Sequence, residues 1–255
     1  EPEEMEETIA YNTLGTVVHQ SLETFYKEWK SKELKIEDLQ EAIKKTPEEV
    51  ALQFRKEYSV EPLSHGKNLL IFEVAKRYVI NFLKMEINIQ KEGNSTKILE
   101  IESHFKSELS IPELDFPVFV HGNVDRIDEF NGLTRIIDYK TGKVQQRDVE
   151  LEDWDDLNTD YDRFGKTFQV LTYAFLLKDN FPSTGPLEAG IISFKNLKNG
   201  FLKFTQKDKS GPGVLESSII DQEILEAFRE QLKKLILEIC DPEIPFQEKE
   251  IKKKW

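Results

Sequence analysis

Two stretches of alternating apolar and polar residues, 117–129 and 133–140, flank the dipeptide Asn131-Gly132. An Asn-Gly pair between two such runs is the strongest short-range signal for a β-hairpin with a two-residue turn, because both turn positions need a positive φ. A turn of this length pairs Phe130 with Leu133 and sets the register of every residue behind them. No other feature of the chain constrains the fold as much as this hairpin.

The register of the hairpin brings charged residues together. Asp125 falls opposite Asp138, where Cβ atoms lie about 4.5–5.5 Å apart, and Lys140 shares the face of Asp138. Two bare carboxylates at that distance repel each other unless a cation lies between them, which favours a divalent metal site. The alternative is a solvent-facing strand end on which Lys140 simply neutralises the aspartates. Ile136 on the same face indicates partial burial, which favours the site.

The remaining chain predicts an α/β fold in which helices precede the sheet. Apolar residues recur at helical spacing over 11–30 and 67–91, and Gly93 suits the end of the later helix. Thr46-Pro47-Glu48-Glu49 carries the signature of a helix start, a capping box with proline in the first turn. We also expect a strand over 96–111, a helix over 165–178, strands over 187–194 and 201–205, a loop over 207–213 and a helix over 221–240.

This order of elements predicts a single domain with a mixed central β-sheet flanked by helices. Its helical portion is expected over about 8–93 and its sheet-containing core over about 94–255. Because the first residue is glutamate, we expect the chain to be a fragment of a longer protein.

The composition limits the kinds of partner. The net charge is −13, from 35 basic and 48 acidic residues. This argues against tight nucleic-acid binding by the bare chain, since such binding normally rests on basic contacts to phosphates, although metal ions in a site supply positive charge locally. The single cysteine excludes an intramolecular disulfide and favours a cytoplasmic setting. The sequence contains no run of about 18 apolar residues, so it predicts no membrane span.

Four motifs resemble the catalytic core of the PD-(D/E)XK nuclease superfamily and are most similar to its RecB/AddB-type branch. They are G-T-V-V-H (15–19), G-N-V-D-R-I-D (122–128), I-I-D-Y-K-T-G-K (136–143) and F-Q-V-L-T-Y (168–173). They occur in the family's order, on elements of the expected type, over about residues 11–195. The resemblance implies a restriction-endonuclease-like core.

The resemblance also implies roles for the matched residues. Asp125 and Asp138 correspond to the metal-binding, catalytic carboxylates, and the backbone carbonyl of Tyr139 to a further ligand. His19 corresponds to a ligand supplied by the preceding helix, where a structural histidine is the alternative. Lys140 corresponds to the catalytic lysine.

Two helical residues extend this comparison. Gln169 and Tyr173 lie four residues apart on one helix face and correspond to residues that position the substrate or brace the site. Alternatively, they are buried polar groups that form hydrogen bonds with each other. Some relatives carry a four-cysteine iron–sulfur cluster, but with Cys240 as the only cysteine no such cluster is expected here.

These features predict hydrolysis of phosphodiester bonds by a water activated by Mg²⁺ or Mn²⁺, with Lys140 orienting that water or stabilising charge on the phosphate. The resemblance implies a DNA exonuclease that acts on single strands or duplex ends in repair or recombination. A helicase domain or subunit would lie outside the chain, which has no G-x-x-x-x-G-K-[ST] motif. DNA versus RNA, exonuclease versus endonuclease action, polarity, the number of ions and the oligomeric state stay open.

Two other classes of protein remain at this point. A non-catalytic module could bind nucleic-acid ends or a partner protein on a nuclease-like scaffold, which the acidic charge favours. A metal-dependent hydrolase could act on a substrate other than nucleic acid, because fold does not dictate substrate. Loss of metal binding would favour the first of these two classes.

Overall fold

The computed structural model describes residues 2–57, 66–181, 185–211 and 213–246. Three helices come first along the chain: α1 (Pro2–Glu28), α2 (Ile36–Glu57) and α3 (Gly66–Lys91). The expected α3 is confirmed, and it is followed by Gly93 with a φ of 87°, a conformation that glycine adopts without steric cost. None of the described helices is both long and apolar enough to cross a membrane.

The expected start of a helix at Thr46-Pro47 is wrong, because α2 begins at Ile36 and Pro47 lies inside it. Thr46 is fully buried, and its hydroxyl donates to the carbonyl oxygen of Ala42 at 2.8 Å instead of capping a helix end. Val50 lies on the buried face of α2 on the far side of this proline. Packing of that face outweighs the missing backbone donor at Pro47.

A five-stranded mixed sheet forms the centre of the molecule, in the order β1-β2-β3-β5-β6. β3 and β5 pair in parallel, so that Lys140 is aligned with Ser193, and the other neighbours pair antiparallel. The strands are β1 (Thr96–Leu109), β2 (Val118–Phe130), β3 (Leu133–Lys140), β5 (Leu187–Ser193) and β6 (Phe201–Lys203). The expected mixed sheet flanked by helices is confirmed.

A smaller three-stranded sheet lies beside the main one. It consists of β4 (Glu150–Leu151), β7 (Thr205–Gly211) and β8 (Gly213–Ser217), in the order β4-β7-β8. The expected loop over 207–213 is therefore wrong where β7 and β8 cover it, and residue 212 lies outside the described residues. The glycine, proline and serine residues in this segment suggested a loop, but Lys207 and Asp208 pair with Glu216 and Leu215 of β8, and Gly211 pairs with Gly213.

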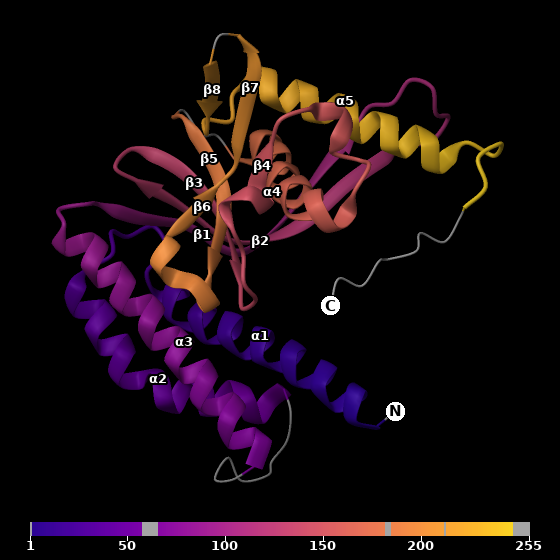
Figure 1. The fold of residues 1–255 in the computed structure, drawn as a ribbon. Helices are drawn as coiled ribbons and strands as arrows, with labels where there is room; N and C mark the ends of the chain where they lie inside the picture. The colour runs from indigo at the N-terminus through magenta and orange to yellow at the C-terminus, as the bar shows by residue number, and fades with distance from the viewer. Residues whose placement is uncertain (1, 58–65, 182–184, 212, 247–255) are drawn as a thin grey trace.

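The remaining elements cover the second face of the main sheet or connect its strands. They are α4 (Tyr161–Asn180), α5 (Gln222–Cys240), and the short 3₁₀ helices η1 (Gln146–Val149), η2 (Trp154–Asp156) and η3 (Phe194–Asn199). Figure 1 shows α1–α3 at the lower left and α4 and α5 at the upper right, with the sheet between them.

Both faces of β3 are buried, as expected for a central strand of a sheet covered on both sides. Ile136 packs with Val170 of α4, while Ile137 and Tyr139 pack with the α1–α3 side of the molecule. Two hydrophobic clusters therefore meet at the sheet. The carboxyl end of β3, which holds Asp138 and Lys140, lies between these two helical layers.

The Asn131-Gly132 turn is confirmed. Both residues have positive φ values, 51° and 83°, and Phe130 pairs with Leu133. The predicted register then continues without a shift to the pair Arg126 and Ile137.

Replacing Gly132 by alanine is expected to destabilise the protein by about 1–2 kcal/mol, the cost of the left-handed conformation for a residue with a Cβ atom. A Cβ atom at this position would contact nothing within 4 Å, so the effect is one of backbone conformation alone. Gly142→Ala is the control, because its Cβ atom would also meet nothing and its φ is not positive. Urea unfolding measures both, and equal stability losses would contradict the prediction.

Candidate metal centre

α1 carries His19 to the end of the main sheet. Val17, Val18 and Leu22 are buried in the α1–α3 cluster, and their spacing leaves His19 at the edge of that stripe with its side chain 27% exposed. Its Nε2 atom lies 3.1 Å from the backbone carbonyl oxygen of Tyr139. The helix face that anchors α1 therefore also fixes the position of the imidazole.

Asp125 meets β3 through its side chain. The ladder between β2 and β3 is paired as far as Arg126 and Ile137, and one residue further the Asp125 Oδ2 atom accepts a hydrogen bond of 2.6 Å from the backbone N–H of Tyr139. The expected direct backbone pairing of Asp125 with Asp138 is thus not part of the ladder. β3 still pairs with β5 at this point. On its other side, the backbone N–H of Tyr139 donates to the carboxylate of Asp125 instead of to the backbone of β2.

Glu102 of β1 joins these residues and was missed from the sequence. His19 Nδ1 lies 3.6 Å from Asp125 Oδ1 and 3.8 Å from Glu102 Oε1. One ligand atom from each of the three residues falls within 4.8 Å of the other two. Glu102 has a φ of 46°, an unusual conformation inside a strand, and such residues cluster at functional sites.

A second group of polar side chains surrounds Asp138. Its Oδ1 atom accepts hydrogen bonds from Lys140 Nζ at 3.1 Å and from Gln169 Nε2 at 3.0 Å. Gln169 also donates to the hydroxyl oxygen of Tyr173 at 2.7 Å. The predicted spacing on α4 therefore does bring Gln169 and Tyr173 to one face, and that face meets Asp138.

The ionisable groups of the site shift one another's pKa values. Burial lowers the pKa of His19, but hydrogen bonds and charge attraction from Asp125 and Glu102 outweigh burial and raise it to about 10. Burial and repulsion from Asp125 raise the pKa of Asp138 to about 6, against the attraction of Lys140 and His19. Each shift has the direction expected where carboxylates lack enough positive charge nearby.

The residues fit a small divalent cation. Carboxylate and imidazole atoms are the donors that Mg²⁺ and Mn²⁺ accept, and ligands on opposite sides of Mg²⁺ lie about 4 Å apart. The separations within the cluster of His19, Glu102 and Asp125 come close to that span. Beside it, the two oxygens of Asp138 lie 3.1 and 2.9 Å from Lys140 Nζ. Each carboxylate oxygen has more than one lone pair, so Asp138 can contact Lys140 and a cation at the same time.

A buried charge network lies behind the site, on the α1–α3 face of the sheet. Arg126 is fully buried and forms ion pairs with Glu86 of α3 at 3.2 Å and with Asp128 at 2.6 Å. It also donates to the Tyr139 hydroxyl at 3.4 Å, and Arg135 holds Asp128 through two hydrogen bonds. The side chain of Tyr139 is thereby held on one face, while its backbone N–H and carbonyl meet Asp125 and His19.

The pKa values within the network follow from these contacts. Burial opposes ionisation of Asp128, but attraction from Arg126 and Arg135 outweighs it and lowers the pKa of Asp128. The network therefore keeps its charges although it is buried. Arg126 and Asp128, two residues apart on β2, pair directly with each other in this network.

The mixed sheet and the acidic site at its edge are those of a metal-dependent nuclease domain. A model of the PD-(D/E)XK nuclease superfamily matches residues 2–250 of the chain, so the chain belongs to that superfamily. Membership implies a metal-dependent nuclease, and the restriction-endonuclease-like fold expected from the sequence agrees with it. No match to the chain is found among curated proteins.

Proposed function

We propose that the chain is a Mg²⁺- or Mn²⁺-dependent deoxyribonuclease of the RecB/AddB type that degrades DNA from its ends in repair or recombination. The observation that carries this proposal is the convergence of His19, Glu102 and Asp125 within 4.8 Å. Asp138 and Lys140 lie beside this cluster, at the end of β3. Action on DNA ends, and work beside a helicase outside the chain, rest on the resemblance of the four sequence motifs to that branch.

The ligand set that we propose combines side chains and backbone. His19, Asp125, Asp138 and the carbonyl oxygen of Tyr139 would hold the ion, and Glu102 is added as a ligand from β1. His19 contacts both that carbonyl and the two carboxylates of the cluster. A bound ion supplies Lewis-acid chemistry, because it polarises the scissile phosphate and lowers the pKa of water.

The remaining residues position groups around the reaction. Lys140 Nζ, held by both oxygens of Asp138, would orient the attacking water and stabilise negative charge that develops on the phosphate. Gln169 fixes Asp138 through its hydrogen bond and is itself linked to Tyr173. These two residues would brace the carboxylate and line the path of the substrate.

The direct test is degradation of end-labelled single-stranded and duplex DNA with Mg²⁺, with Mn²⁺ and with EDTA. We expect cleavage only with a divalent ion, and short products that accumulate from the first time point would indicate exonuclease action. Calorimetry of Mn²⁺ binding to wild type and Asp138→Ala tests the site separately. Absence of both cleavage and metal binding would favour a non-catalytic module that binds nucleic-acid ends or a partner protein.

Glu102→Gln is expected to weaken Mn²⁺ binding at least about tenfold, equal to about 1.4 kcal/mol, because it removes one charged ligand while keeping the size of the side chain. Glu100→Gln is the matched control, since Glu100 lies on the same strand but pairs with Lys30 at 2.7 Å. Calorimetry measures both variants. Similar affinities for the two would show that Glu102 is not a ligand.

A further inference from the structure

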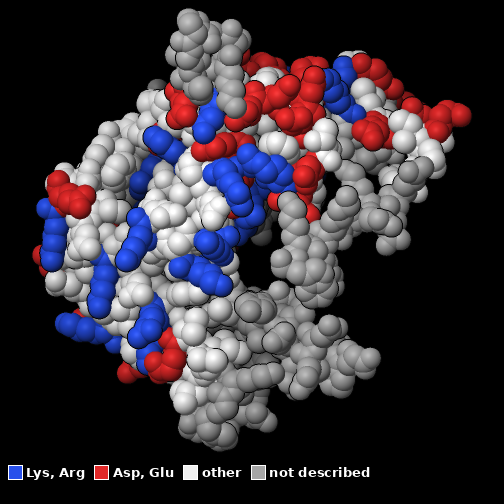
Figure 2. Space-filling view, viewed as in Figure 1, with Lys and Arg blue, Asp and Glu red and all other residues white. Residues whose placement is uncertain are grey.

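The acidic chain carries a basic surface on one side. Figure 2 shows Lys and Arg over α3 and the η3–β6 segment, whereas Asp and Glu gather at the upper right, over α5. Arg77 and Lys84 of α3 and Lys195 and Lys198 of η3 are all exposed. We call these four residues and the two elements that carry them the α3–η3 surface. It stands out because the net charge of the chain is −13.

The four cations of the α3–η3 surface differ in their surroundings from other lysines of the chain. Within the described part of the chain, none of the four residues forms an ion pair with an acidic side chain. Elsewhere such pairs are common, for example Lys44 with Glu41 of α2 and Lys234 with Asp155. Even the neighbouring Lys76 is paired with Glu73 at 2.5 Å. Four cations in one region that pair with none of the described acidic residues indicate a surface whose negative partner comes from outside the chain.

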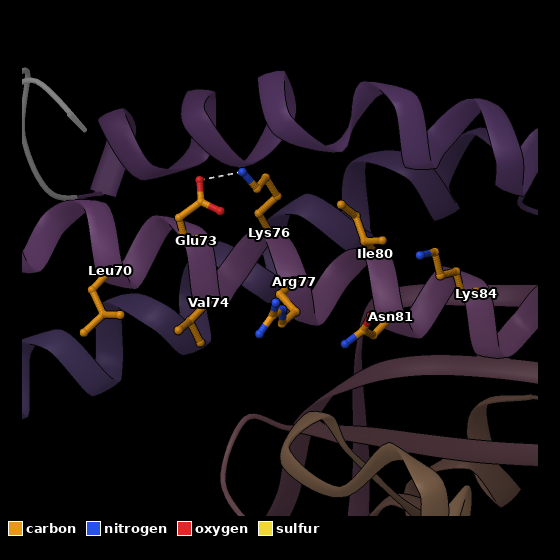
Figure 3. Close-up of a pocket in the computed structure, with 8 residues that line it drawn as sticks. All are labelled: Leu70, Glu73, Val74, Lys76, Arg77, Ile80, Asn81 and Lys84. Carbon is orange, nitrogen blue, oxygen red and sulfur yellow. Dashed lines mark hydrogen bonds and ion pairs between the residues drawn. The ribbon is translucent and has the colours of Figure 1, made fainter. Parts of the chain in front are cut away.

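α3 carries a shallow hollow beside its exposed cations. The hollow has a volume of about 530 Å³ and is lined by Arg77 and Lys84 together with apolar residues such as Val74 and Ile80. Figure 3 shows Arg77 and Asn81 projecting from the same side of α3. Arg77 and Lys84 are seven residues apart, hence on one helix face about 10 Å from each other. That distance corresponds to about three base-pair steps along the axis of a duplex, at about 3.4 Å for each step.

The α3–η3 surface is connected to the metal centre through the sheet. Tyr78 of α3 and Phe194 of η3 stack with ring centroids 6.0 Å apart, which holds the two elements together. Phe194 directly follows Ser193, and Ser193 is aligned with Lys140 across β5 and β3. η3 therefore begins at the same end of the sheet as the proposed site.

We propose that the α3–η3 surface binds the phosphate backbone of the nucleic-acid strand whose scissile bond lies at the metal centre. Arg77, Lys84, Lys195 and Lys198 contact phosphates of this strand and guide it toward Lys140. This inference rests on the proposed nuclease function and adds to it the place where the substrate outside the site is held. It also explains how a chain with a large negative charge binds a polyanion.

The test measures DNA binding without metal, so that it is separate from catalysis. Fluorescence anisotropy in EDTA compares wild type with Arg77→Gln/Lys84→Gln/Lys195→Gln/Lys198→Gln on labelled duplex DNA at several salt concentrations. We expect at least about a 30-fold rise in Kd. We also expect the slope of log K against log salt to fall by about three to four, because each lost phosphate contact contributes about 0.9.

The control is Lys44→Gln/Lys178→Gln/Lys233→Gln/Lys234→Gln, which also removes four positive charges but takes them from lysines that pair with acidic residues. It is expected to raise Kd no more than about threefold. An equal loss in both variants, or no salt-dependent binding by wild type, would overturn the inference. If the α3–η3 variant binds DNA as well as wild type and still cleaves it, the proposed surface is refuted and the nuclease function is not. If wild type binds DNA as expected but binds no Mn²⁺, the nuclease function is refuted and the surface is not.

Discussion

Replacing Lys140 by alanine is expected to slow DNA hydrolysis at least about 100-fold, a loss of about 2.7 kcal/mol in transition-state stabilisation. The Lys140 ammonium lies 2.9 and 3.1 Å from the two oxygens of Asp138, and its side chain is about one-third exposed. It is therefore held in place and still reachable by a phosphate. Preorganised charges of this kind act mainly on the charge that develops in the transition state. Single-turnover cleavage with Mn²⁺ measures the effect.

Two comparisons make the result specific to Lys140. Lys178→Ala removes a lysine from α4 that pairs with Glu226, and we expect a rate within about threefold of wild type. Mn²⁺ binding by Lys140→Ala should remain measurable in calorimetry at pH 8, because the ligands stay in place. A variant that cuts at the wild-type rate would remove Lys140 from the proposed mechanism.

Replacing Arg126 by methionine is expected to destabilise the protein by about 3–5 kcal/mol, the usual cost of removing one partner of a buried ion pair. Glu86 is only 1% exposed and would lose the ion pair that it forms with Arg126. Asp128 would still be held by Arg135 at 2.8 Å. Urea unfolding of the variant measures the loss.

The double variant Glu86→Leu/Arg126→Met provides the control for this explanation. It removes both charges of the pair and replaces them with apolar side chains of similar volume, which is often close to neutral for stability. We therefore expect it to recover most of the stability lost in the single variant. A double variant no more stable than Arg126→Met would show that the loss comes from packing rather than from the orphaned charge.

The part of the fold that the sequence predicted best is local. The Asn131-Gly132 turn determines its own register through backbone conformation, so Phe130 to Arg126 could be paired with β3 correctly. Gln169 and Tyr173 lie on one helix turn, so their common face followed from helical geometry. In each case neighbours in the sequence decide the arrangement.

The residues that were missed depend on contacts distant in the sequence. Glu102 reaches the site because β1 pairs with β2 across a connection with no tight-turn signal, and the register of that pair could not be read from the residues. The start of α2 was misplaced for a related reason. Thr46 and Pro47 carry a strong local signal, but burial of the helix face in the α1–α3 cluster overrides it.

The contact between His19 and the carbonyl of Tyr139 joins residues 120 positions apart. Glu102 and Asp125 lie between them in sequence, and Gln169 lies beyond them. Closing so long a segment costs entropy before any contact stabilises it. A partly synthesised or partly folded chain therefore has the carboxylates but not their arrangement. Nuclease activity should consequently appear only with the complete fold, which would spare the cell's nucleic acid from nascent and misfolded copies of the protein.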